Sequence, residues 1–289
     1  MSMEFLENNL GDMLSNEIKK FVKNIDANIF QEIQGHYFDE PIVQFASSDN
    51  PLFKEYKELI GEYHLTPQEV MHAEFPEQPH KYGSVISVVL PIDAKTRKSN
   101  REENEYGSKE WALTRYYGDE VFVARLAEYI VTYLNKYGYC AIAPSQSDFF
   151  FKKQIGRDIT SNWSERHIAY AAGLGTFSIN DGFITEKGIA VKLISIVTDA
   201  KILQSKQIYQ HYQQNCLWCS KGTCGACMKR CPVGAITEKG HDKIKCYIHC
   251  YGEESQAIAK KYGGDARYGS GCGLCQTGVP CEFKNPLRG

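Results

Sequence analysis

The sequence lacks long apolar runs and a recognisable leader. No stretch of its 289 residues approaches the roughly 20 consecutive apolar residues that a membrane-spanning helix needs. The first residues contain no basic segment followed by an apolar run, which a secretion signal would require. These absences predict a soluble cytoplasmic protein that has no membrane partner.

The sequence also lacks a strong excess of charge. The formal net charge is −2, although residues 206–289 hold 12 basic and 6 acidic side chains. That basic segment is also rich in cysteine, and thiolates bound to metal would offset its charge, because a metal site contributes its own charge. The chain therefore predicts no broad basic face, and nucleic acid is not an expected partner.

A dinucleotide-binding motif is absent too. No G-x-G-x-x-G follows a predicted strand, so the sequence indicates no ordinary dinucleotide fold. What is present is ample material for a core, with 43% hydrophobic and 12% aromatic residues. The length fits one large or two medium domains.

The first two thirds of the chain read as a mixture of helix and strand. Apolar spacing and capping residues predict four helices, at residues 15–30, 51–63, 117–137 and 161–174. Short β-branched runs predict strands, at residues 84–92, 140–143, 183–184 and 191–197, the last two joined as a hairpin by Thr-Glu-Lys-Gly. The charged segment 93–105 is predicted to be a surface loop. A change of pattern in residues 199–207 predicts two domains, 1–205 and 206–289.

Cysteine is the strongest signal. Ten of the eleven cysteines lie between Cys216 and Cys281, and Cys140 stands apart in an apolar strand context, typical of a core residue. Without a secretion signal, such a cluster indicates metal ligation rather than a disulfide framework.

The spacing of one part of this cluster is specific. Cys224, Cys227 and Cys231-Pro232 reproduce the last three cysteines of the bacterial ferredoxin run, C-x2-C-x3-C-P. Lys221 occupies the position where that run has its first cysteine, so Cys216 or Cys219 must supply that ligand. The spacing leaves this choice open.

The remaining cysteines form a second set. It contains Cys246 or Cys250, then the pair Cys272 and Cys275, and finally Cys281. In two-cluster ferredoxins the cysteine before proline ligates the other cluster. Crossed ligation then predicts two 4Fe–4S clusters. The first is held by Cys224, Cys227 and Cys281 together with Cys216 or Cys219, and the second by Cys231, Cys246, Cys272 and Cys275.

Structural zinc is the competing interpretation, because zinc sites also use paired C-x2-C steps. A zinc ribbon does not require C-x2-C-x3-C-P, however, and would divide the cysteines into two consecutive fours. The pattern therefore favours iron–sulfur clusters, which would transfer single electrons.

The segment from about residue 161 to Cys281 resembles the epoxyqueuosine reductase family and, more distantly, the reductive dehalogenases. The resemblance lies in Ser164-Glu165-Arg166, Ala172-Gly173-Leu174-Gly175, Asn180, Ile184-Thr185, Val197-Thr198-Asp199 and the cysteines. The ending, Cys275 to Glu282, is more similar to an anaerobe subgroup of this superfamily than to the tRNA-modifying enzymes. The resemblance also favours Cys216 over Cys219.

The resemblance implies a fold and a cofactor. The expected fold is α+β, a nitroreductase-like α/β domain followed by a ferredoxin-like two-cluster domain. The expected cofactors are two 4Fe–4S clusters and cobalamin, with a ferredoxin or flavodoxin type of electron donor and an unidentified small-molecule substrate. The implied activity is a cobalamin-dependent iron–sulfur reductase. The rival hypotheses are an electron-transfer protein without its own substrate and an epoxyqueuosine reductase acting on tRNA.

The residues that would serve this chemistry are less distinctive. Asp158, seven residues before Glu165, and Tyr117 are candidate proton donors; their alternatives are a solvated carboxylate and a packed ring. Gly173, Gly175, Glu165 and Arg166 are candidates for binding the cofactor. A helix stop would equally explain the glycines, and an ion pair would explain Glu165 and Arg166.

Overall fold

A four-stranded antiparallel sheet forms the centre of the protein. The structure is a computed structural model that describes residues 3–78, 83–156 and 158–288. The strand order is β3 (Ile42–Ser47), β4 (Ser84–Pro91), β10 (Val191–Thr198) and β5 (Ala141–Ile142). Every neighbouring pair is antiparallel, and β4 and β10 pair along their whole lengths.

The sheet separates two hydrophobic cores. In β4, Ile86, Val88 and Leu90 belong to one core, whereas Val85 and Val89 belong to the other. Successive side chains of a strand point to opposite faces, so a continuous apolar run is what a strand covered on both sides requires. The predicted strand at 84–92 is confirmed.

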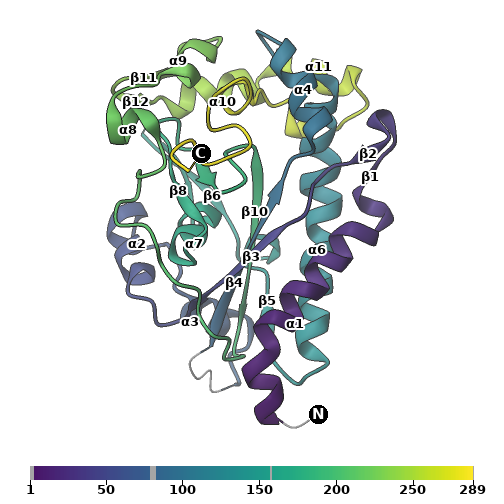
Figure 1. The fold of residues 1–289 in the computed structure, drawn as a ribbon, viewed down its shortest axis with the longest axis vertical. Helices are drawn as coiled ribbons and strands as arrows, with labels where there is room; N and C mark the ends of the chain where they lie inside the picture. The colour runs from purple at the N-terminus through teal and green to yellow at the C-terminus, as the bar shows by residue number, and fades with distance from the viewer. Residues whose placement is uncertain (1–2, 79–82, 157, 289) are drawn as a thin grey trace.

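Helices cover both faces of this sheet (Figure 1). One face packs against α1 (Met3–Asn24) and α6 (Val123–Asn135). The other packs against α2 (Leu52–Ile60), α3 (Pro67–Glu74) and α7 (Glu165–Ala171). The helices predicted at 51–63, 117–137 and 161–174 are thus confirmed, while the one predicted at 15–30 begins earlier and ends at Asn24.

The prediction of a surface loop at residues 93–105 is wrong, because this segment contains α4 (Ala94–Glu102). The Asp93 carboxylate caps this helix by accepting a hydrogen bond of 2.7 Å from the Lys95 amide. Its buried residues are Thr96, Arg97 and Asn100. Because that buried side is polar, the sequence carries no apolar periodicity there.

The helix α6 is preceded by α5 (Lys109–Leu113) and by a π-helix, η3 (Thr114–Phe122). Wide turns of this kind occur frequently at functional sites. Short 3-10 helices also occur, at Asp26–Asn28, Gln31–Ile33, Pro144–Gln146, Ala266–Tyr268 and Leu274–Gln276.

Four small hairpins surround the central sheet. They pair β1 (Ile29–Phe30) with β2 (Gly35–His36), β6 (Lys152–Ile155) with β7 (Asp158–Ser161), β8 (Gly175–Phe177) with β9 (Phe183–Thr185), and β11 (Ile236–Thr237) with β12 (Gly240–His241). The predicted pairing of β9 with β10 is therefore wrong. The amides of Ile189 and Ala190, which precede β10, instead donate to the carbonyls of Cys281 and Glu282. The chain between β9 and β10 therefore pairs with the C-terminal segment.

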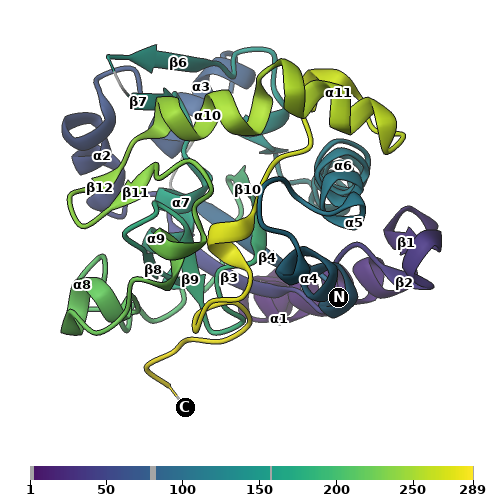
Figure 2. The same ribbon diagram turned by 90° about the horizontal axis from the view of Figure 1, so that it is seen from above.

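The cysteine-rich segment lies at one end of the sheet, where Figure 2 shows α10 and α11 running across the top of the fold. Its helices are α8 (Leu217–Lys221), α9 (Ala226–Arg230), α10 (Lys243–Tyr251) and α11 (Glu253–Lys261). A third core joins it to the rest of the chain and contains Ile184, Ile189, Cys216, Cys227, Ile236 and Val279. Residues 201–209, where the domain boundary is predicted, form neither helix nor strand.

Within the described ranges, no helix is both long and apolar enough to cross a membrane.

We expect Leu126→Ala to lower the free energy of unfolding by about 2–5 kcal/mol, because Leu126 is completely buried and its truncation leaves a cavity in the α6 core. Leu59→Ala is the matched control, since Leu59 is 73% exposed and its loss should change stability by less than about 0.5 kcal/mol. Anaerobic denaturant titration measures both. Equal losses for the two variants would contradict the assigned packing.

Candidate functional site

Four cysteines line one small pocket. Cys216 precedes α8, Cys224 and Cys227 flank the start of α9, and Cys281 lies near the chain end. Gly225, between Cys224 and Cys227, has φ +125°, a conformation that side chains rarely adopt. The pocket brings together the four cysteines predicted for the first cluster. We refer to them as the first cysteine group.

Cys219 lies beside this group but does not line its pocket. Burial and the neighbouring Cys216 raise the pKa of the Cys219 thiol to about 12. Burial also opposes ionisation of Cys216, but the amides of Cys219 and Ile179 and the Ser178 hydroxyl outweigh it, so the pKa of Cys216 is lowered. Cys216 is the better placed of the two, because it lines the pocket with Cys224, Cys227 and Cys281.

The second cysteine group gathers at α10 and the loop after α11. It contains Cys246, Cys250, Cys272 and Cys275. The Sγ atoms of Cys246 and Cys250 are 3.9 Å apart. Cys250 also contacts Cys272, while Cys275 lies near Cys246, Cys272 and Cys231. Cys281 lines the pocket of the first group, whereas the predicted membership of Cys231 in the second group stays a prediction.

The two groups are neighbours. Buried Cys275 of the second group is close enough to Cys227 of the first for their charges to interact. No three His, Cys, Asp or Glu side chains among the described residues close around a single metal ion.

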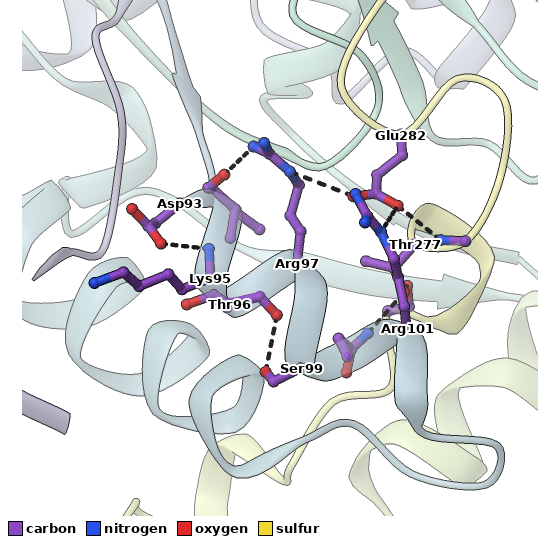
Figure 3. A network of polar contacts seen from close by, with 12 residues as sticks. Asp93, Lys95, Thr96, Arg97, Ser99, Arg101, Thr277 and Glu282 are labelled. Carbon is purple, nitrogen blue, oxygen red and sulfur yellow. Dashed lines mark hydrogen bonds and ion pairs between the residues drawn. The ribbon is translucent and has the colours of Figure 1, made fainter. Parts of the chain in front are cut away.

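A buried carboxylate fastens the chain end to α4 (Figure 3). Glu282 follows Cys281, is 2% exposed and accepts hydrogen bonds of 2.7 and 2.5 Å from the Arg101 guanidinium. The Gly278 amide donates to the same carboxylate at 2.8 Å, and Nε of Arg97 lies 3.4 Å from it. Arg97 also donates to the Ile92 carbonyl.

The same helix holds the second cysteine group. The Asn100 side-chain amide donates to the Cys272 carbonyl at 3.2 Å and to the Thr277 hydroxyl at 3.0 Å. Asn100 is fully buried. The helix α4 therefore positions both groups, and the sequence carried no signal for this role because the partners are more than 170 residues away.

The predicted proton donors lie in different parts of the molecule. Asp158 starts β7, is exposed and forms an ion pair of 3.2 Å with Lys243 on α10. Tyr117 belongs to the π-helix, is 37% exposed and packs near the rings of Tyr37 and Tyr116. Their predicted catalytic roles stay predictions.

The glycines predicted to bind a cofactor pack against backbone. A Cβ on Gly175 would lie 2.3 Å from the Ile184 carbonyl oxygen, inside the β8–β9 pair. Gly173 has φ +77°, and a Cβ there would lie 3.0 Å from the Lys206 carbonyl oxygen. Close approach of the chain to itself therefore explains both glycines, and the space beside them is filled.

Glu165 and Arg166 diverge at the start of α7. Arg166 is exposed, whereas both carboxylate oxygens of Glu165 are buried without a hydrogen bond of ordinary geometry to any described residue. Burial raises the pKa of Glu165 to about 7, although the nearby Ser195 and Ser145 favour the charged form. The pair is not an ion pair between adjacent side chains.

Sequence reasoning missed a polar loop between β8 and β9. Its Asp181 carboxylate lies 3.2 Å from Nδ1 of His241, and its Ser178 and Asn180 contact cysteines of both groups. Isolated polar residues of this kind have no spacing signature, so only their placement reveals them.

The fold matches solved reductases. A catabolic reductive dehalogenase aligns with a TM-score of 0.53 and 16% identity, over 86% of this chain and 30% of that chain. The same enzyme in complex with 3-bromo-4-hydroxybenzoic acid aligns with a TM-score of 0.52 and 17% identity, over 85% of this chain and 30% of that chain. This chain has the reductive dehalogenase fold. That match confirms, at the level of fold, the resemblance inferred from the sequence.

An epoxyqueuosine reductase from Bacillus subtilis aligns with a TM-score of 0.48 and 18% identity, over 94% of this chain and 66% of that one. The chain thus spans about a third of the dehalogenase and about two thirds of the epoxyqueuosine reductase. No family model and no curated protein matches the sequence.

We expect the stability of the wild type to fall relative to Glu165→Gln as the pH rises from about 5 to 8. The pKa of Glu165 is about 7 in the folded protein and about 4.3 in an unfolded chain. Below both values the carboxyl is protonated in either state, so it has no effect. As the pH rises the unfolded state ionises first, which costs the folded state on the order of 3 kcal/mol once both are ionised.

Denaturant titrations at several pH values measure this difference. Glu40→Gln is the control, because Glu40 is an exposed carboxylate paired with Lys19 at 3.0 Å and should not reproduce the fall. Parallel profiles for the wild type and Glu165→Gln would show that the Glu165 carboxylate is not buried as described.

Proposed function

We propose that this chain is an iron–sulfur reductase that passes electrons through two 4Fe–4S clusters to an acceptor in its N-terminal part. The observation that carries the proposal is that Cys281, near the chain end, lines the same pocket as Cys216, Cys224 and Cys227. Crossed ligation of this kind is the arrangement of two-cluster ferredoxins. The reductive dehalogenase fold supports the same class of activity.

Four thiols that line one pocket are the ligand set of a cubane cluster. A cubane takes each thiolate on a separate iron, which spaces its ligands more widely than the ligands of one zinc ion. The proposed ligands are those predicted from the sequence, Cys216, Cys224, Cys227 and Cys281 for the first cluster, and Cys231, Cys246, Cys272 and Cys275 for the second. Cys219 and Cys250 remain as additional thiols.

The path of the electrons follows from adjacency. Cys227 and Cys275 neighbour each other across the two groups, so an electron would pass between the clusters without an intermediate carrier. An external low-potential protein of the ferredoxin or flavodoxin type is the proposed donor.

Cobalamin is the proposed acceptor on the sequence resemblance alone. The residues predicted to hold it do not form a cradle in this structure, because backbone fills the space beside Gly173 and Gly175. We therefore assign no residue to cobalamin and derive no step through it. The substrate would be a small reducible molecule.

Closed packing at those glycines favours a second candidate function, an electron-transfer protein that has no substrate of its own. An epoxyqueuosine reductase acting on tRNA is the third candidate. Its substrate carries a phosphate backbone, which a chain of formal charge −2 is poorly suited to bind.

We expect the wild type, reconstituted anaerobically, to hold about eight iron atoms per chain, and Cys281→Ser to hold about four, because the serine removes one ligand of the first cluster. Cys219→Ser is the matched control and should keep about eight, since Cys219 does not line the pocket. Iron and sulfide analysis gives these numbers. Stoichiometric zinc in place of iron, or equal losses in both variants, would refute the assignment.

If cobalamin is the acceptor, one equivalent should bind to the iron-loaded protein under strict anaerobiosis, with the change in visible spectrum that follows loss of the axial base. The titration is monitored by absorbance, and the same protein without cobalamin serves as the reference. An unchanged corrinoid spectrum together with full iron content would instead establish the electron-transfer candidate.

A further inference from the structure

The loop Ser178–Gly182 connects β8 to β9 and reaches both cysteine groups. The Ser178 hydroxyl oxygen lies 3.6 Å from Sγ of Cys216, which belongs to the first group. Two residues later, the side-chain amide of Asn180 donates a hydrogen bond of 3.1 Å to the carbonyl of Cys275, which belongs to the second. The loop comes from the part of the chain that precedes the cysteine-rich segment.

This loop is held rigidly. The Ser178 amide donates to the Gly182 carbonyl at 2.8 Å, and the Asp181 amide donates to the Ser178 carbonyl at 3.0 Å. The Asn180 side-chain oxygen accepts from the Gly182 amide at 2.9 Å. Asp181 has φ +59°, a strained conformation that persists only where surrounding contacts determine it. Its carboxylate is anchored to His241.

The contact between Ser178 and Cys216 is shielded from water. Ser178 is 3% exposed and Cys216 is 5% exposed. Bound to a cluster, the Cys216 sulfur carries no proton, so the serine hydroxyl must be the donor. A hydrogen bond to a thiolate in a dry environment is stronger than the same bond in water.

We propose that Ser178 sets the reduction potential of the first cluster by donating a hydrogen bond to Cys216, and that Asn180 positions the second cluster through the Cys275 carbonyl. The inference rests on the proposed function, since it requires that the clusters are present. Reduction adds negative charge to a cluster and its sulfurs. A donor at the sulfur stabilises that charge and raises the potential.

The two contacts predict different consequences. The Ser178 hydroxyl meets a sulfur directly, so its removal changes the electronic environment of one cluster only. Asn180 meets a backbone oxygen, so it acts on the second cluster by orienting the Cys272–Cys275 turn. One loop therefore gives each cluster its own support, and the N-terminal part of the chain keeps the two potentials different.

The decisive experiment is a redox titration of Ser178→Ala, monitored by electron paramagnetic resonance after anaerobic reconstitution. We expect a negative shift in the midpoint potential of one cluster and an unchanged midpoint for the other. Ser220→Ala is the matched control, because the Ser220 hydroxyl donates to the carbonyl of the same Cys216 at 2.7 Å and not to its sulfur. This control should leave both midpoints in place. Ser178→Thr retains the hydroxyl and should restore the wild-type value.

Iron analysis before each titration separates the two proposals. A wild type that holds no clusters overturns the proposed function. Full iron content with unchanged midpoints in Ser178→Ala overturns the inference and leaves the function standing. Should the alanine variant lose iron, Ser178→Cys, which fills the same space with a weaker donor, makes the comparison; a midpoint equal to that of the wild type would again overturn the inference.

Discussion

Both cysteine groups depend on the attachment of the chain end to the central domain at Cys281 and Glu282. The carbonyls of these two residues accept hydrogen bonds from Ile189 and Ala190, immediately before β10 enters the sheet. The Glu282 carboxylate is buried against Arg101 on α4. Breaking such a pair leaves an uncompensated charge in the interior, which is strongly unfavourable. The ion pair therefore holds Cys281 against the first group, whose other cysteines lie much earlier in the sequence.

The helix α4 connects this attachment to the second cysteine group. It faces the protein with arginines and Asn100 rather than with an apolar stripe, and Asn100 binds the Cys272 carbonyl. A polar contact fixes direction as well as distance, whereas an apolar contact fixes only proximity. The clusters proposed here would be oriented by hydrogen bonds from a helix and a loop that belong to the sheet domain. Such orientation is what electron transfer to an acceptor in that domain would require.

The elements that the sequence predicted well are those with a simple period. A strand buried on both faces must be apolar throughout, and 84–92 has that pattern because β4 lies at the centre of the sheet. The helix at 117–137 was equally visible, since one side of α6 packs on the sheet. By contrast, α4 was missed because its buried side is polar. The prediction of a hairpin between β9 and β10 was wrong, because β9 pairs with β8 and β10 pairs with β4.

The candidate site divides in the same way. The spacing of Cys224, Cys227 and Cys231 by itself predicted ligation through thiols, because a short C-x2-C step brings two thiols together whatever the remainder of the chain does. Spacing did not decide between Cys216 and Cys219. The fold distinguishes them, since only Cys216 lines the pocket and receives the Ser178 contact.

The sequence by itself thus predicted thiol ligands, the central strands and the likeness to the reductive dehalogenases, which the structure confirms at the level of fold. Only the tertiary structure decided which cysteines share a group, which polar residues support them and that Gly173 and Gly175 pack against backbone. The physical reason is the sequence separation over which each effect acts. Periodicity and ligand spacing act between residues a few positions apart, whereas Glu282 with Arg101, and Asn180 with Cys275, meet only after the whole chain has folded.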